Sequence, residues 1–227
     1  MIYINSPRAR ACLRVALPAV AIPATVLFGA LFLQDNYTVI SLLMATLTLL
    51  LFFAGIEKKK LSARRLTLTA VITALSVAGR FIPIFKPVTA FAVTAGICLG
   101  GEVGFTVGAM SALISNVWFG QGPWTPFQML AWGAIGYAAG LLDRPLRKFP
   151  LLLYLYGAVS GVLYSLIMDV WSVLWYHGTF DISLYAASVL TSLPYMISYA
   201  VSNVVFLIVL FRPFRQKLDR IKLKYGI

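Results

Sequence analysis

The sequence is poor in charged residues and in the residue types that form metal and nucleophilic sites. Only 11% of its 227 residues are charged and 60% are apolar, whereas a soluble domain carries about 25% charged residues. It has one histidine and two cysteines, and no GxxxxGKS/T, HExxH, CxxC or GxSxG motif. These absences argue against a soluble enzyme, a nucleic-acid reader and a disulfide-stapled secreted domain. They also give no support for catalytic residues, a metal site or ATP binding by this chain.

The sequence consists largely of long apolar runs. A helix needs about 20 apolar residues to cross a bilayer, and a helix satisfies its backbone polar groups internally. The runs fall at about 13–33, 37–56, 66–82, 88–100, 103–118, 126–142, 151–176 and 184–211. The sequence therefore predicts an all-α integral membrane protein of eight helices, in which the fourth and fifth runs are short.

The net charge of +12 is distributed as a membrane topology signal. Of the 19 Lys and Arg residues, 17 fall in four clusters, Arg8–Arg14, Lys58–Arg65, Arg144–Lys148 and Arg212–Lys224. Basic residues that flank membrane helices stay in the cytoplasm. We therefore expect a multi-pass protein of the bacterial cell membrane with both termini cytoplasmic, in contact with anionic lipid and with no nucleic-acid partner. Arg80 and Lys86 lie outside these clusters and need another explanation.

The segment Ser115–Gly133 joins two predicted helices and is rich in aromatic and amide side chains. Its centre reads Gly-Gln-Gly-Pro-Trp-Thr-Pro-Phe-Gln-Met, and its prolines and glycines predict a non-helical backbone. Such backbone is tolerated at membrane depth only where it is buried in protein or lines a water-filled cavity. Gln121 and Gln128 would supply amide groups, and Trp118 and Trp124 flat apolar faces. An aromatic belt at the membrane surface is the alternative for the tryptophans.

Together with the stretch before it, this segment is similar to a known family. The preceding stretch reads Ala-Gly-Ile-Cys-Leu-Gly-Gly-Glu-Val-Gly-Phe-Thr-Val-Gly-Ala, and residues 66–210 as a whole resemble the substrate-binding S component of energy-coupling factor (ECF) vitamin transporters. The resemblance implies a six-helix membrane protein that captures a vitamin from outside the cell and is not an enzyme. It also implies docking on a transmembrane T subunit driven by two ATPase subunits. Those partners use ATP, so this chain itself would bind no cofactor.

The resemblance and the charge clusters divide the chain into four parts. We expect an N-terminal transmembrane helix pair at 1–56, a basic cytoplasmic linker at 57–65, a six-helix substrate-binding core at 66–211 and a basic cytoplasmic tail at 212–227. The helix pair departs from the family pattern, and its role stays open. Within the core, glycines recur every four residues at positions 96, 100, 104 and 108, which predicts close helix packing.

The first core helix carries a stripe of small residues. Ala70, Ala74 and Ala78 repeat at i, i+4 and i+8 and therefore lie on one helix face. The resemblance implies that this stripe docks the T subunit, because an Ala-xxx-Ala pattern does so in the family. Internal packing is the alternative.

The vitamin pocket is expected between the loops 80–88, 118–127 and 176–183. An aromatic site with few charges suits a large planar ligand. The candidate binding residues are Arg80, Lys86, Trp118, Gln121, Trp124, Gln128, Asp169, Trp171, Trp175, Tyr176, Tyr195 and Tyr199. An acid inside a membrane helix is costly and functional by default, so Asp169 either binds the ligand or pairs with Arg80. The two isolated cations would meet a phosphate or carboxylate of the ligand, and solvation in the loop is the alternative for Lys86.

Cobalamin is the cargo expected from these features, because it is large, rich in amides and carries one phosphodiester. This expectation rests largely on the resemblance to cobalamin-type S components. Riboflavin, a pyridoxine-like vitamin, pantothenate and folate remain open. A membrane-embedded enzyme is weakened by the lack of clustered catalytic groups, and a standalone channel or secondary transporter by the lack of charged residues along a central path.

Overall fold

The described part of the chain is helical throughout. The computed structural model describes residues 6–32, 37–54 and 63–225, and no strand occurs within these ranges. Three stretches are long and apolar enough to cross a membrane, Ala11–Phe32, Pro150–His177 and Ile182–Ile221. Shorter apolar helices accompany them. The prediction of an all-α membrane protein is therefore confirmed.

Two helical stretches precede the core. The first consists of α1 (Pro7–Ala16) and α2 (Ile22–Phe32), joined without a break by a π-helical segment at Leu17–Ala21. Pro18 lies in that segment and cannot donate a helical hydrogen bond, which favours local widening of the turn. The second stretch is α3 (Tyr37–Ala54). The first six residues of the predicted basic linker at 57–65 lie outside the described residues.

Seven further helices follow in the described chain. They are α4 (Ala63–Gly79), α5 (Val88–Leu99), α6 (Gly101–Phe119), α7 (Trp124–Leu141), the short α8 (Asp143–Lys148), α9 (Pro150–His177) and α10 (Ile182–Tyr225). The last helix is longer than its apolar run, because the basic residues after position 211 continue it. Within that extension Arg215 lies 3.5 Å from Asp219, one turn further on, a spacing that supports helix.

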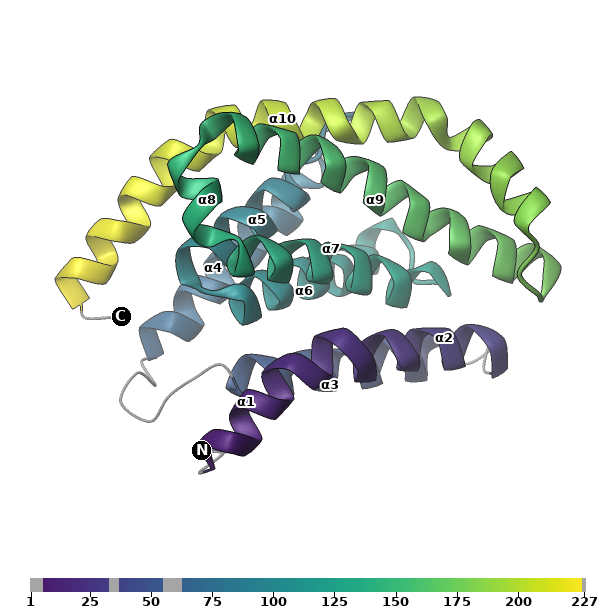
Figure 1. Ribbon diagram of the computed structural model, residues 1–227, viewed down its shortest axis with the longest axis horizontal. Coiled ribbons are helices and arrows are strands. Elements are labelled where there is room, and N and C mark those ends of the chain that lie inside the picture. The colour runs from purple at the N-terminus through teal and green to yellow at the C-terminus, as the bar shows by residue number, and fades with distance from the viewer. Residues whose placement is uncertain (1–5, 33–36, 55–62, 226–227) are drawn as a thin grey trace.

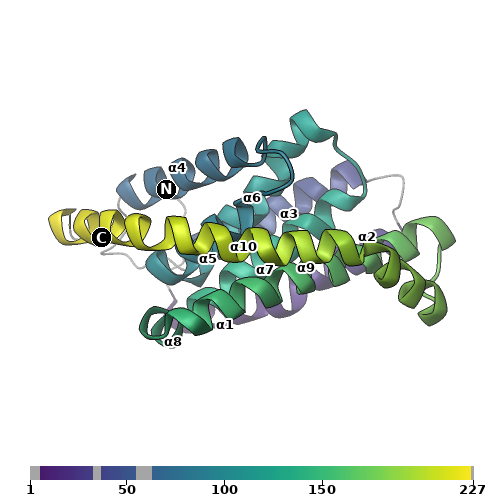
Figure 2. The same ribbon diagram turned by 90° about the horizontal axis from the view of Figure 1, so that it is seen from above.

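The helices are arranged in layers with their ends aligned. Figure 1 shows α1–α3 on one side of α6 and α7, and α10 on the opposite side. The N-terminus, α8 and the C-terminal part of α10 lie at one end of the molecule, which we call the basic end. The α9–α10 turn lies at the other end, called here the far end, in both views (Figures 1 and 2). The basic segments within the described residues thus gather at one end, as a topology signal requires.

The contact between α6 and α7 is made by glycines. A Cβ atom placed on Gly104 would lie 2.4 Å from the carbonyl oxygen of Gly136, and one on Gly108 would lie 2.3 Å from that of Trp132. Both of these oxygens are backbone atoms, so they cannot move out of contact as a flexible side chain could. Small residues at this spacing allow helix backbones to touch, which is how helices associate where lipid removes the hydrophobic drive. The predicted close packing is confirmed.

The short helix α5 is shielded from lipid by the rest of the protein. Its 12 residues rise only about 18 Å, less than a hydrocarbon core of about 30 Å, and every one of them is buried. It ends at Gly100, whose φ of +105° lets the chain turn directly into α6. Arg65 and Arg147 donate to the carbonyl oxygens of Leu99 and Ile97 at 2.7 and 2.5 Å. These two arginines satisfy carbonyl groups that the helix end leaves open.

The N-terminal helices are tied to the core by an ion pair and a hydrogen bond. The Arg14 guanidinium pairs with Glu102 at the start of α6, and only 4% of the Glu102 side chain is exposed. The hydroxyl of Tyr137 donates to the backbone carbonyl of Arg14 at 2.6 Å. An unpaired carboxylate at this depth would be costly, so α1 supplies the charge that lets Glu102 stay buried.

The glycine contact gives a direct test of the fold. Gly104→Ala is expected to destabilise the protein by about 1–3 kcal/mol, because its methyl group collides with the α7 backbone. Gly178→Ala is the matched control, because nothing lies within 4 Å of its added Cβ and only about 1 kcal/mol is lost to its left-handed backbone. Thermal unfolding in detergent measures both. A Gly104→Ala protein as stable as the unmodified protein would contradict the packing.

Candidate functional site

The loop between α4 and α5, residues 80–87, is held in a fixed and strained shape. Pro83 and Pro87 restrict its backbone, and Ile84 has a φ of +63°. A β-branched residue in this region is an outlier, and such strain concentrates at functional sites. The hydroxyl of Ser202 in α10 donates to the carbonyl of Lys86 at 3.2 Å, which fixes the end of the loop against α10.

Arg80 begins this loop and points its side chain into the protein. Arg80 is 8% exposed, and its Nη1 donates to Ser115 Oγ and Asn116 Oδ1, both at 2.5 Å. Its guanidinium carbon lies 4.9 Å from the ring centre of Phe119 and 5.2 Å from that of Trp132. Aromatic faces attract a cation at such distances. Four side chains of α6 and α7 therefore hold the Arg80 charge without neutralising it.

A chain of hydrogen bonds runs from Arg80 to α9. Asn116 Nδ2 donates to Thr125 Oγ1 at 2.7 Å and to Gln128 Oε1 at 3.0 Å. Gln128 Nε2 in turn donates to the Tyr164 hydroxyl at 3.2 Å. Buried polar groups need such partners, and a fully connected network fixes the geometry of all its members. We call Arg80, Ser115, Asn116, Gln128 and Tyr164 the Arg80 cluster.

Aromatic rings connect this cluster to α10. The rings of Trp132 and Tyr164 are stacked, with centroids 4.9 Å apart and an interplanar angle of 10°. Tyr199 of α10 meets Tyr164 edge to face at 5.0 Å. Ring pairs in these geometries attract each other beyond their burial. Tyr199 thus forms the border between the buried cluster and the space outside it.

A cavity of about 470 Å³ opens on the other side of Tyr199. We call it the central cavity. It lies between the 80–87 loop and α10, and its lining residues are Ile84, Lys86, Pro194, Tyr195, Ser198 and Tyr199. Its volume falls within the range of roughly 300–1,000 Å³ that is usual for small-molecule sites. The lining is mostly apolar and aromatic, with one ammonium group and a few hydroxyl groups.

The electrostatic environment of the cavity is positive. Lys86 Nζ lies 5.5 Å from the Phe119 ring, the same ring that Arg80 approaches. Burial, followed by the positive charge of Arg80, lowers the pKa of the Lys86 ammonium group in the loop. Among the described residues no ion pair joins Arg80 or Lys86 to a carboxylate. The site can therefore attract ligand groups that are negative or accept hydrogen bonds.

A comparison with protein families is consistent with a ligand site in this part of the chain. A family model described as ECF-type riboflavin transporter, S component, matches residues 60–220, most of the chain. The chain belongs to this family. It is thus a membrane component of a transporter, the part that captures a vitamin and works with T and ATPase subunits, and not an enzyme. Comparisons with curated proteins and with solved structures found no significant match.

The family match changes the expectation about the cargo. The model is that of a riboflavin transporter component, so it does not support the cobalamin-specific type. The N-terminal helices α1–α3 precede the matched residues, consistent with their being an addition to the S-component core.

Five of the predicted binding residues of this S component lie at the central cavity or in the cluster behind it. They are Arg80, Lys86, Gln128, Tyr195 and Tyr199. The sequence did not single out Asn116, Phe119 or Tyr164 as ligand-site residues. Asn116 carried a signal, because it is an amide inside an apolar run. Tyr164 lies in a long apolar helix and is distinguished only by what it packs against.

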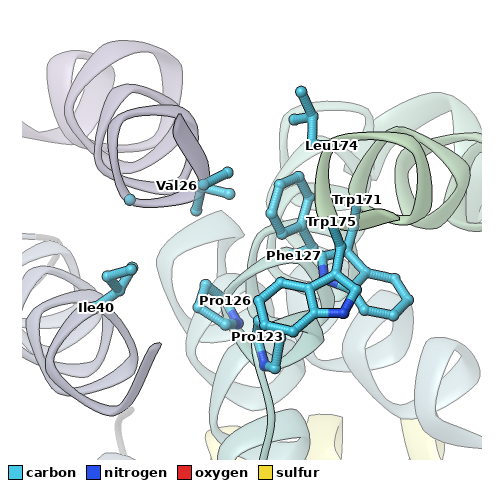
Figure 3. Close-up of a pocket in the computed structure, with 10 residues that line it drawn as sticks. Val26, Ile40, Pro123, Pro126, Phe127, Trp171, Leu174 and Trp175 are labelled. Carbon is cyan, nitrogen blue, oxygen red and sulfur yellow. The ribbon is translucent and has the colours of Figure 1, made fainter. Parts of the chain in front are cut away.

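Two of the predicted tryptophans line a different cavity, and a third packs against one of them. Figure 3 shows Trp171 and Trp175 of α9 facing Pro123, just before α7, and Pro126 in its first turn, with Val26 and Ile40 of the N-terminal helices across from them. This cavity measures about 20 Å³, enough for about one water molecule and far too small for a vitamin. Trp124 packs edge to face against Trp171 at 5.8 Å. These rings therefore pack the N-terminal helices onto the core.

The remaining predicted side chains lie toward the far end and away from the central cavity. Gln121 donates to the carbonyl of Leu113 at 2.8 Å and accepts from Thr125 at 3.0 Å, so it shapes the α6–α7 connection. Trp118 is 64% exposed and Tyr176 is 73% exposed. Tyr176 borders a separate cavity of about 260 Å³ between α9 and α10.

Asp169 joins α9 to α10. Its two carboxylate oxygens accept from the hydroxyls of Ser188 and Ser192, both at 2.8 Å. No ion pair to Arg80 occurs among the described side chains, so the alternative of an Asp169–Arg80 pair is wrong. The serines of α10 supply the partners that a buried acid needs.

The alanine stripe of this S component faces outward. Ala70, Ala74 and Ala78 are all exposed on α4. Figure 2 shows α4 along one edge of the molecule, and the main contacts of α2 and α3 with the core, among the described residues, are with α6, α7 and α9. The alternative of internal packing is therefore wrong, and the stripe is free to meet another protein or lipid.

Asp169→Leu tests whether this acid stabilises the fold or binds cargo. We expect the free energy of unfolding to fall by about 1–3 kcal/mol, because Ser188 and Ser192 lose their acceptors. Vitamin affinity of the folded protein should not change, because Asp169 is not part of the cavity lining. Thermal unfolding and equilibrium binding measure the two effects. A normal melting temperature with lost affinity would place Asp169 in the ligand site.

Proposed function

We propose that this S component captures a flavin-type vitamin, riboflavin or a close derivative, in the central cavity. The observation that carries the proposal is the cavity of about 470 Å³ between the strained 80–87 loop and α10, in a chain of the riboflavin-transporter S-component family. The cavity and the loop occupy the matched region, and the loop is anchored to α10 through Ser202.

The chemistry of the lining supports a flat heterocyclic ligand. Tyr195 and Tyr199 offer aromatic faces for a tricyclic ring, and Ile84 and Pro194 offer apolar contact. The carbonyl oxygens and ring nitrogens of a flavin accept hydrogen bonds, and Lys86 and the tyrosine hydroxyls are donors. A corrin with its nucleotide loop is several times larger than a flavin and would have to project far outside the cavity. Size and family therefore both favour the flavin.

The direction of loading follows from the charges. The basic segments gather at the basic end (Figure 1), and basic flanks stay in the cytoplasm. We propose that both termini are cytoplasmic and that the far end faces the exterior of the cell. Cargo would then enter from the far-end side and leave toward the cytoplasm when the partner subunits hydrolyse ATP.

We propose that the exposed alanine stripe on α4 docks the T subunit. Alanines let a partner helix approach closely while little side-chain entropy is lost. The N-terminal helices leave this face open, because they contact α6, α7 and α9. The additional helix pair would therefore be compatible with assembly of the complete transporter.

Tyr199→Ala tests the flavin site. Purified protein should bind riboflavin and quench its fluorescence, and the variant should bind several-fold to about tenfold more weakly, because an aromatic contact worth about 0.5–1.5 kcal/mol is removed. Tyr176→Ala is the matched control, because Tyr176 is exposed and lies outside the central cavity. Titration with cobalamin, read by its absorbance, runs in parallel. Binding of cobalamin and not of riboflavin would overturn the flavin assignment.

Ala70→Trp combined with Ala74→Trp tests the docking stripe. The bulky rings should abolish uptake in cells that express the T and ATPase subunits, while the affinity of the purified S component stays unchanged. Ala186→Trp is the matched control, since Ala186 is an exposed alanine on α10. Radiolabelled vitamin uptake and copurification with the T subunit measure the effect. Normal uptake by the double variant would refute the docking role.

A further inference from the structure

Two cations lie on one aromatic ring beside the central cavity. Arg80 is 4.9 Å and Lys86 is 5.5 Å from the centre of the Phe119 ring. Burial, followed by the positive charge of Arg80, lowers the pKa of the Lys86 ammonium group, because like charges repel each other more strongly at low dielectric. Neither forms an ion pair with a carboxylate in the described chain. Within the described residues, therefore, no carboxylate compensates either of these two positive charges.

The side chains that accept hydrogen bonds from Arg80 are neutral. Ser115 and Asn116 accept its hydrogen bonds, whereas Arg14, which is half-exposed, forms an ion pair with the buried Glu102. Arg80 Nε is buried and has no hydrogen-bond partner among the residues that the structure describes. A guanidinium with a free donor edge suits an oxyanion.

Lys86 connects this charge to the ligand space. It lines the central cavity and is only partly buried, so a ligand in the cavity can contact its ammonium group. Arg80 contributes charge from behind Phe119 and Trp132. Protein charges at low dielectric act strongly on a bound ion.

We infer that the S component prefers a ligand bearing a negatively charged group, a flavin phosphate over the neutral flavin, with the anion held by Lys86 in the field of Arg80. This inference rests on the proposed flavin function and narrows it. The anion compensates the two cations that the protein leaves unpaired, so its binding relieves their repulsion as well as adding contacts.

The test compares flavin mononucleotide with riboflavin on the purified full chain in neutral detergent. Flavin mononucleotide should bind about tenfold more tightly, the value of one charged hydrogen bond. Lys86→Gln should abolish this preference by weakening flavin mononucleotide more than riboflavin, whereas Lys86→Arg should retain it. Asn116→Asp places a carboxylate where Asn116 now accepts from Arg80, and it should reduce the preference as well.

Each outcome of this experiment either supports or overturns the preference for a flavin phosphate. Riboflavin binding as tightly as its phosphate, or a preference that survives Lys86→Gln, overturns the inference and leaves the flavin function standing. Binding of neither flavin overturns both. A parallel titration with added anionic phosphatidylglycerol separates a lipid phosphate from the cargo phosphate. If that lipid removes the preference by competition, the cations serve a lipid headgroup and the inference is wrong.

Discussion

The glycine contact between α6 and α7 is the constraint on which the rest of the structure depends. Gly104 and Gly136 bring the two backbones so close that no side chain fits between them. Because the two helices are locked, Asn116 near the end of α6 and Gln128 near the start of α7 meet at hydrogen-bond distance. The same locked pair provides the surface that the N-terminal helices cover. In a bilayer, where burial of apolar surface between helices gains little, such contact is the main source of cohesion.

A polar cluster inside this apolar frame sets the character of the site. Asn116 and Gln128 hold Arg80 and Tyr164 in place, so the positive charge has one defined position. The 80–87 loop then brings Lys86 to the neighbouring cavity and is fixed to α10 by Ser202. Site geometry and site charge thus have separate origins: the cluster positions the cation, and the loop carries the ligand-facing surface.

Sequence reasoning identified Arg80 and Lys86 correctly as unusual, because each is a cation outside the basic clusters. It also grouped Gln128, Tyr195 and Tyr199 with them, and the structure places all five at or behind one cavity. It also grouped Trp171 and Trp175 with them, whereas the structure places these two at the small cavity beside the N-terminal helices. A tryptophan that packs against another helix and one that contacts a ligand cannot be distinguished in a sequence. The difference depends on which part of the folded protein faces the ring.

The sequence by itself determined the all-α membrane class, the clustering of the basic segments and the close approach of the glycine helices, since these follow from composition and from local spacing. Only the tertiary structure decided which polar residues meet. Asp169 faces serines of α10 rather than Arg80, and the alanines of α4 face outward rather than into the core. Such choices depend on the rotation of each helix about its axis, and packing between helices distant in the chain fixes that rotation.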